Sequence, residues 1–187
     1  MTEERIEKNK VKFKEINETY DIFTPELEEF LGEDFFLSPA SASLDMYYCY
    51  PGGLVDFLMN ICKYAVKVNE TLPEIIKVDK KSLVRTIFLS QIGKTFLFKL
   101  NENEWMVKNK GKMYEYRDDD IVIMSIGERS AYYAINCGVK LSDVEYQAIL
   151  NSDKEQTERF MRGSRPLYYV MKMGLEITLM EEKHGKE

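Results

Sequence analysis

Hydrophobic residues recur at helical spacing along most of this chain. Between residues 54 and 65 they fall at offsets of four, seven, eight and eleven, which predicts a helix with one buried stripe. A similar stripe covers residues 83–91, where Asp79 can serve as the N-cap and Gly93 is expected to end the helix in left-handed backbone. A third stripe covers residues 167–178. The pattern therefore predicts a core built from helices.

Capping residues set the expected limits of three further helices. Thr24 and Pro25 supply an N-cap and a proline at the first helical position, and Gly32 ends the short helix that follows. A helix is expected over residues 127–138. The segment 142–145 begins with serine and ends with glutamate, the spacing of a capping box, which predicts another helix immediately after it.

Two segments depart from this pattern. Residues 104–116 alternate around a glycine turn and predict a small β-hairpin. Apolar residues are sparse among charges in the segment 3–18, which favours an exposed or partner-docked helix over a core helix. We therefore expect an all-α fold with one small hairpin, comprising a helical extension (1–34), a helical domain (35–180) and a charged tail (181–187).

Composition narrows the function classes. The 187 residues are 44% hydrophobic and 31% charged, with a net charge of −6, which argues for one soluble domain without the uniform basic field of non-specific DNA binders. The only histidine is His184 in the charged tail, which excludes most histidine-based catalysis. Cys49, Cys62 and Cys137 lack CxxC spacing and are expected to be free thiols. The chain shows no apolar leader or spanning run, so we expect a cytoplasmic protein with no membrane contact.

Four stretches together resemble one known family. They are Ser38-Pro39-Ala40-Ser41 ahead of Tyr50-Pro51-Gly52-Gly53-Leu54-Val55-Asp56-Phe57, Phe88-Leu89-Ser90-Gln91-Ile92-Gly93-Lys94, the hairpin with Trp105, and Ile126-Gly127-Glu128-Arg129-Ser130 with Val139-Lys140-Leu141-Ser142 downstream. In order and spacing, the chain resembles the HD superfamily of metal-dependent phosphohydrolases over residues 35–180. The form it resembles is the single-domain one of bacteria and their phages.

The resemblance implies metal ligands that this chain lacks. The positions at which the family carries histidine or aspartate hold Tyr47, Phe57, Ser90, Gln91 and Ile126, with a further histidine position at Asn151 or Ser152 and a late aspartate near Leu175 or Glu176. The family's metal lowers the pKa of a bound water and so generates the nucleophile. Phenylalanine and isoleucine offer no lone pair, and serine and glutamine are weak neutral ligands. We therefore expect a lost catalytic site with no metal and no cofactor, filled by apolar groups.

Several candidate residues are compatible with two different roles. Lys94 and Glu128 are either a phosphate-binding lysine and a general base or charges favoured by helix dipoles. The basic stretch with Arg159, Arg162 and Arg165 suits anion or RNA contact, whereas the acidic residues just upstream favour local ion pairing. An aromatic cluster forms either an interface or part of the core, and its members are Met46, Tyr47, Tyr48 and Tyr50.

The preferred hypothesis is a catalytically inactive HD-fold pseudoenzyme that binds another protein, in a phage or mobile-element assembly. One alternative is nucleotide binding or residual nucleotide hydrolysis by Asp56, Glu128 and Glu176 with Mg²⁺, which requires these carboxylates to converge. A second alternative is RNA binding through the arginine stretch.

Overall fold

The computed structural model describes residues 3–117, 124–154 and 165–185. Its elements in chain order are α1 (Glu3–Tyr20), α2 (Pro25–Leu37), α3 (Gly53–Thr71), the 3-10 turn η1 (Glu74–Ile76), α4 (Lys80–Leu89), the 3-10 turn η2 (Ile92–Lys94), β1 (Phe98–Leu100), α5 (Glu104–Lys110), β2 (Tyr114–Tyr116), α6 (Ile126–Asn136), α7 (Asp143–Leu150) and α9 (Pro166–His184). Helices predominate, and β1 and β2 form a two-stranded antiparallel sheet. The predicted fold class, all-α with one small hairpin, is confirmed.

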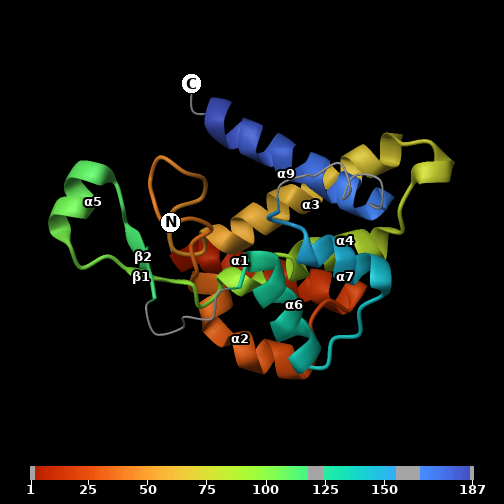
Figure 1. Ribbon diagram of the computed structural model, residues 1–187, viewed down its shortest axis with the longest axis horizontal. Helices are drawn as coiled ribbons and strands as arrows, with labels where there is room; N and C mark the ends of the chain where they lie inside the picture. Colours follow the sequence, from red (N-terminus) through yellow and green to blue (C-terminus); the bar gives the residue numbers. More distant parts are fainter. Residues whose placement is uncertain (1–2, 118–123, 155–164, 186–187) are drawn as a thin grey trace.

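The core lies between the long helices α3 and α9 and the helices α1, α2, α4, α6 and α7 (Figure 1). The apolar stripe of α3 is buried, as its spacing predicts, and α9 packs closely along it. At their crossing, a Cβ on Gly174 would lie 2.6 Å from the Cβ of Ala65, so the approach of the two helices requires a glycine there. The caps at Thr24, Asp79, Ser125 and Ser142 start α2, α4, α6 and α7.

The hairpin differs in detail from its prediction. Residues 104–110 form helix α5, capped by the Asn103 side chain, and not a strand. The first strand lies earlier, at residues 98–100, and pairs Phe98 with Tyr116. The alternation at 104–107 does not mark a strand. A short exposed helix lacks an apolar stripe, so the spacing of its hydrophobic residues does not reveal the helical period. The unit formed by β1, α5 and β2, which we name the arm, projects from the helical body (Figure 1).

The N-terminal helix belongs to the core, contrary to the expectation of an exposed or partner-docked helix. Phe13 is buried, and its ring lies 5.2 Å from those of Phe35 and Phe88, measured between centroids. On the next turn toward the N-terminus, Asn9 is also buried. Few apolar residues are needed because the single ring of Phe13 packs against several aromatic rings of the core, which a count of hydrophobic positions does not reveal.

Gly93 also differs from its prediction. Its backbone is not left-handed, since α4 ends at Leu89 and Gly93 lies inside η2. The glycine is needed for close packing, because a Cβ there would lie 2.7 Å from the carbonyl oxygen of Ile126 and 2.9 Å from the hydroxyl of Ser130. At Gly32, by contrast, φ is +50° and the helix kinks, in agreement with the predicted helix end.

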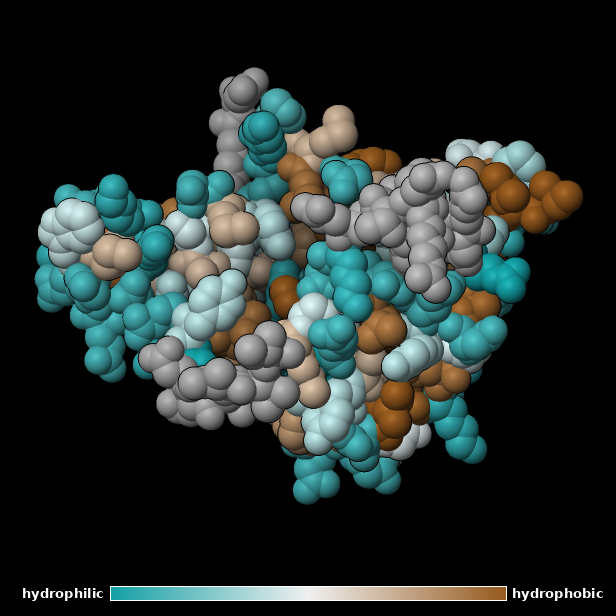
Figure 2. Space-filling view, viewed as in Figure 1, coloured by the Kyte–Doolittle hydropathy of each residue, from teal (hydrophilic) through white to brown (hydrophobic). Residues whose placement is uncertain are grey.

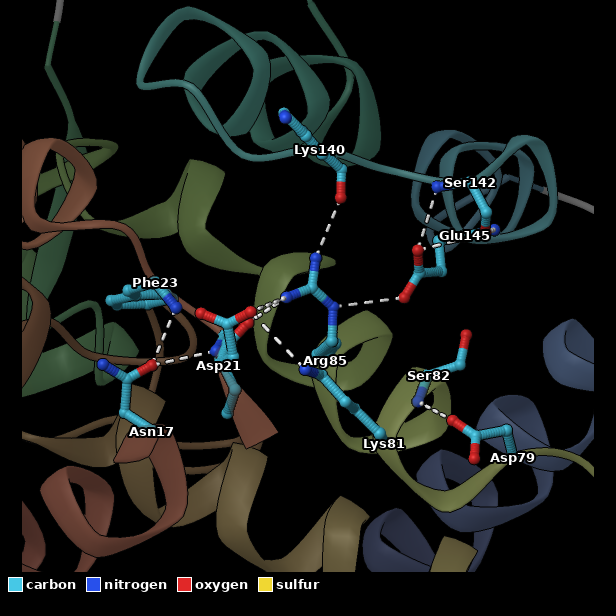
Figure 3. A network of polar contacts seen from close by, with 11 residues as sticks. Asn17, Asp21, Phe23, Asp79, Lys81, Ser82, Arg85, Lys140, Ser142 and Glu145 are labelled. Atoms are coloured by element: carbon cyan, nitrogen blue, oxygen red, sulfur yellow. Dashed lines mark hydrogen bonds and ion pairs between the residues drawn. The ribbon is translucent and has the colours of Figure 1, made fainter. Parts of the chain in front are cut away.

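A buried arginine on α4 contacts the α1–α2 connection, the α6–α7 connection and helix α7 (Figure 3). The Arg85 guanidinium on α4 donates to the carbonyl oxygen of Asp21 and, at 2.9 Å, to that of Lys140. It also pairs with the Glu145 carboxylate at 3.3 Å, and both side chains are about nine-tenths buried. Glu145 in turn completes the capping box of α7. Arg85 therefore fixes the ends of α1 and α6 and the start of α7 relative to α4.

Candidate functional site

Aromatic stacking joins two of the positions at which the resemblance implies metal ligands. The rings of Tyr47 and Phe57 lie 4.8 Å apart between centroids at an interplanar angle of 27°. Phe57 is on the buried stripe of α3, and the loop carrying Tyr47 is held by the Ser41 hydroxyl, which donates to the Tyr47 carbonyl at 2.6 Å. Two π-faces therefore lie where the resemblance implies imidazole ligands.

Lys94 extends from η2 into contact with this stack. Its Nζ lies 5.0 Å from the Tyr47 ring centroid and 5.3 Å from that of Phe57. It donates to the Ala40 carbonyl at 2.9 Å and to the Tyr47 hydroxyl at 3.2 Å, and the residue is 2% exposed. Burial lowers the pKa of Lys94 to about 7, while the negative charge of Asp153 acts in the opposite direction. Lys94 is thus enclosed by protein groups and is not a helix-end cation in water.

The Ser90 and Gln91 positions lie at the end of α4 and are buried. The Ser90 hydroxyl donates to the Ile87 carbonyl at 2.8 Å, which occupies its hydrogen. Its carbonyl oxygen accepts from the hydroxyls of Ser130 at 3.1 Å and Ser152 at 3.3 Å. Ser130 also accepts from the Gly93 N–H at 2.9 Å. The serine hydroxyls thus join α4, α6 and the residues after α7, a partnership that the sequence pattern did not reveal.

Ile126 is the first residue of α6, and an acidic residue caps this end of the helix. The Asp153 carboxylate accepts from the backbone N–H groups of Ile126 at 2.8 Å and Gly127 at 3.2 Å. Glu128 closes the capping box with Ser125 and pairs with Lys154 at 3.1 Å. The backbone N–H of Ser125 and the Lys154 charge lower the pKa of Glu128. The helix-start role of Glu128 is therefore present in the structure, and Asp153 is a second carboxylate there that sequence reasoning missed.

The three carboxylates of the hydrolase alternative do not meet. Asp56 is buried, accepts from the Asn9 amide at 2.7 Å and pairs with Arg5 at 3.0 Å, which attaches α1 to α3. Glu128 is engaged at the start of α6, and Glu176 is exposed on α9. Within the described residues, no group of three or more His, Cys, Asp or Glu side chains is placed to hold a metal ion. The prediction that Asp56, Glu128 and Glu176 converge on one site is therefore wrong.

The side chains around Lys94 do not suit a divalent cation either. The Lys94 nitrogen, which repels a cation when protonated, lies against the Tyr47 hydroxyl, and Phe57 has no donor atom. The space among these groups is used by the Lys94 chain itself. We therefore derive no chemical step through a metal at this position.

The arginine stretch, the aromatic cluster and the cysteines are the other features singled out in the sequence. Arg159 and Arg162 lie outside the described residues, and Arg165 is exposed at the N-cap position of α9. In the aromatic cluster Tyr48 is buried, whereas Met46 is exposed, so the cluster divides between core and surface. All three cysteines are free, as expected.

Exposed apolar side chains gather on the arm and on the loop beside it. The loop is bonded to the arm, since the Leu44 N–H donates to the Gly111 carbonyl at 2.9 Å and the Tyr114 N–H donates to that of Ala42 at 3.0 Å. A small separate core beneath contains Cys49, Phe98 and Tyr114. The large apolar residues exposed over these segments, which we name the arm surface, are Leu44, Met46, Leu100, Trp105 and Tyr116.

Comparison with protein-family models, with curated proteins and with solved structures gives no match to this chain. The HD resemblance therefore stays a prediction from the four sequence stretches. A search of the described helices finds none that is long and apolar enough to cross a bilayer.

Proposed function

We propose that the protein is a catalytically inactive HD-fold pseudoenzyme that acts as a protein-interaction module. The observation that carries this proposal is the Lys94 side chain, which is enclosed between its own carbonyl partner and the Tyr47–Phe57 stack. The positions named by the resemblance are linked in space, because η2 bears Lys94 and also packs against Ile126 and Ser130. An inherited site filled by aromatic rings and a lysine cannot activate water through a metal.

The arm surface supports the second half of the proposal. Trp105 and Leu100 are more than half exposed, although burial of a tryptophan or leucine is strongly favourable. Exposed aromatic and aliphatic side chains gathered on one projection are typical of sites that bind another protein. We therefore propose that the partner covers the arm surface.

We place this partner in a phage or mobile-element assembly and the protein in the cytoplasm, which is the host cytoplasm if a phage encodes it. The phage or mobile-element assignment rests on the resemblance, and the cytoplasmic assignment is supported by the described helices, none of which is long and apolar enough to cross a bilayer. Nucleotide binding and RNA binding through the arginine stretch are retained as competing functions, and the experiments below distinguish them.

Ligand-dependent thermal stability tests the lost site. The full chain is melted alone and with Mn²⁺, Mg²⁺ and a panel of nucleotides, and nucleotide hydrolysis is measured in parallel. We expect unchanged melting temperatures and no turnover. A ligand at 100 times its Kd would stabilise the chain by about 2.7 kcal/mol, so binding would be readily detected. A shift with a nucleotide, or metal-dependent turnover, would support the competing hydrolase instead.

A matched pair of variants tests the interaction surface. Trp105→Ser removes the largest exposed ring of the arm, and Met180→Ser alters a similarly exposed apolar residue on α9 as the control. Proteins retained by the tagged wild type are compared with those retained by each variant, before and after nuclease treatment. We expect a partner that Trp105→Ser loses and Met180→Ser keeps. Retention that depends on RNA, or that is equal for both variants, would contradict the proposed surface.

A further inference from the structure

The loop between α3 and α4 presents apolar side chains to solvent in a fixed conformation. This apolar loop, residues 72–78, includes Ile75, which is 92% exposed, and Ile76, which is also exposed. In Figure 2 the hydrophobic colour reaches the edge of the molecule where η1 projects in Figure 1. An isoleucine that buries almost none of its surface within its own chain is a strong candidate for contact with another chain.

The conformation of the apolar loop is held by polar contacts at its base. The buried Asn69 side chain donates to the Val78 carbonyl at 2.9 Å and accepts from the Val78 N–H at 3.0 Å, which joins the two ends of the loop. Within the loop, the Ile76 N–H donates to the Pro73 carbonyl at 3.0 Å, and Lys77 pairs with Glu74. Ile75 is therefore displayed by a preorganised turn, so little conformational entropy is lost when it is bound.

A hollow adjoins this projection. It is a groove of about 460 Å³ between the end of α1 and the facing sides of α3 and α4. We name it the α3–α4 groove, and its lining includes Ile16, Met59, Val66 and Val84. Glu70 and Lys80, which flank the apolar loop in the sequence, are also part of the lining, so the projection stands at the margin of the hollow.

The apolar loop and the α3–α4 groove also carry complementary charges. Glu74 lies beside Ile75 on the projection, where it is paired with Lys77 and still largely exposed. The margin of the groove carries three lysines, Lys63, Lys67 and Lys80, against one acid, Glu70, so lysines outnumber acids there. Lys63 pairs with Glu181, whereas no ion pair joins Lys67 or Lys80 to another described residue. An apolar projection with an acid beside it thus adjoins an apolar hollow with lysines beside it.

We propose that the occupant of the α3–α4 groove is a second copy of this chain, bound through a two-fold contact in which each copy inserts Ile75 into the groove of the other. A two-fold interface requires one patch that is complementary to itself, and a projection adjacent to a matching hollow meets that requirement. In this arrangement Glu74 of one copy faces the lysines at the groove margin of the other. The contact leaves the arm surface free, so it is independent of the proposed partner binding.

Sedimentation velocity of the full chain over a wide concentration range tests the contact. We expect the wild type to approach twice the chain mass of 22.0 kDa, and Ile75→Glu to return it to the chain mass. Leu100→Glu, which alters an exposed apolar residue on the arm, serves as the matched control and should remain dimeric. Circular dichroism verifies that each variant is folded, which is expected because Ile75 contributes little to the core.

Charge reversal tests how the two copies are docked. Glu74→Lys should weaken the dimer at least tenfold, and Glu74→Lys combined with Lys80→Glu should restore it, since the pair is then reversed across the interface. A wild type that stays monomeric at every concentration would overturn the proposal, and so would a dimer that is indifferent to Ile75→Glu. Failure of the double variant to recover the dimer would overturn the placement of Ile75 in the groove.

Discussion

Replacing Lys94 by methionine should change how the stability of the protein depends on pH. The residue is 2% exposed, and burial lowers its pKa from an ordinary value of 10.5 to about 7. The unfolded chain therefore binds more protons than the folded chain between these two values. Stability must rise with pH across that window because the folded state is relieved of a buried charge.

The magnitude follows from the two pKa values. Well below pH 7 the buried ammonium destabilises the fold by about 5 kcal/mol relative to a neutral amine, and by pH 9 the penalty falls to about 2 kcal/mol. Between about pH 7 and pH 9 the wild type should thus gain about 2 kcal/mol that Lys94→Met does not gain. Loss of the hydrogen bonds to Ala40 and Tyr47 shifts the methionine curve by a constant amount and leaves its slope unchanged.

Urea unfolding of both proteins at a series of pH values measures this difference. Burial also raises the pKa of the thiols of Cys49, Cys62 and Cys137, which lowers stability at alkaline pH, but this contribution is common to both chains and cancels. Lys112→Met, the same substitution at an exposed position, controls for the change in net charge. Parallel curves for the wild type and Lys94→Met would refute a buried lysine with a lowered pKa.

Three further substitutions have defined outcomes in urea unfolding at neutral pH. Gly93→Ala should destabilise the chain by about 1–3 kcal/mol because the added Cβ meets the Ile126 carbonyl and the Ser130 hydroxyl, and an unchanged midpoint would contradict the close packing. Glu145→Ala should cost about 3 kcal/mol by leaving the buried Arg85 without its carboxylate; a cycle with Arg85→Met should show strong coupling, and additive effects would contradict the pair. Thr24→Ala should cost about 1 kcal/mol through loss of the α2 cap, and a neutral effect would refute that role.

Much of the helical architecture follows from local signals in the sequence. The stripes of α3 and α9 and the capping box that starts α7 are short-range patterns, and each leads to the helix it predicts. Two of the failures have a common physical cause, which is dependence on a distant partner. Phe13 is buried only because α2 and α4 meet it, and Gly93 is small because α6 approaches it.

The same reasoning applies to the candidate site. Tyr47 and Phe57 could be named from the sequence as positions at which the resemblance implies metal ligands. Their stacking and the contact of Lys94 with them and with Ala40 depend on tertiary structure. Lys94 stands at the end of the 3-10 turn η2, as the helix-end interpretation expects, but its side chain is buried, which no pattern in the sequence indicates. Its interpretation as a phosphate-binding residue stays a prediction. No pattern in the sequence indicates that Asp153 caps α6, because it does so by accepting from backbone N–H groups that lie 26 and 27 residues away.

Direct titration of the full chain with Mn²⁺, followed by electron paramagnetic resonance of the free ion, tests most directly the proposal that an inherited cation site has been lost. Because Lys94 and aromatic rings lie where the resemblance implies metal ligands, we predict that the free Mn²⁺ signal rises in proportion to the metal added, with no saturable site. Binding of Mn²⁺ at one or two ions per chain that is abolished by substitution of Ser90 or Gln91 would contradict the account.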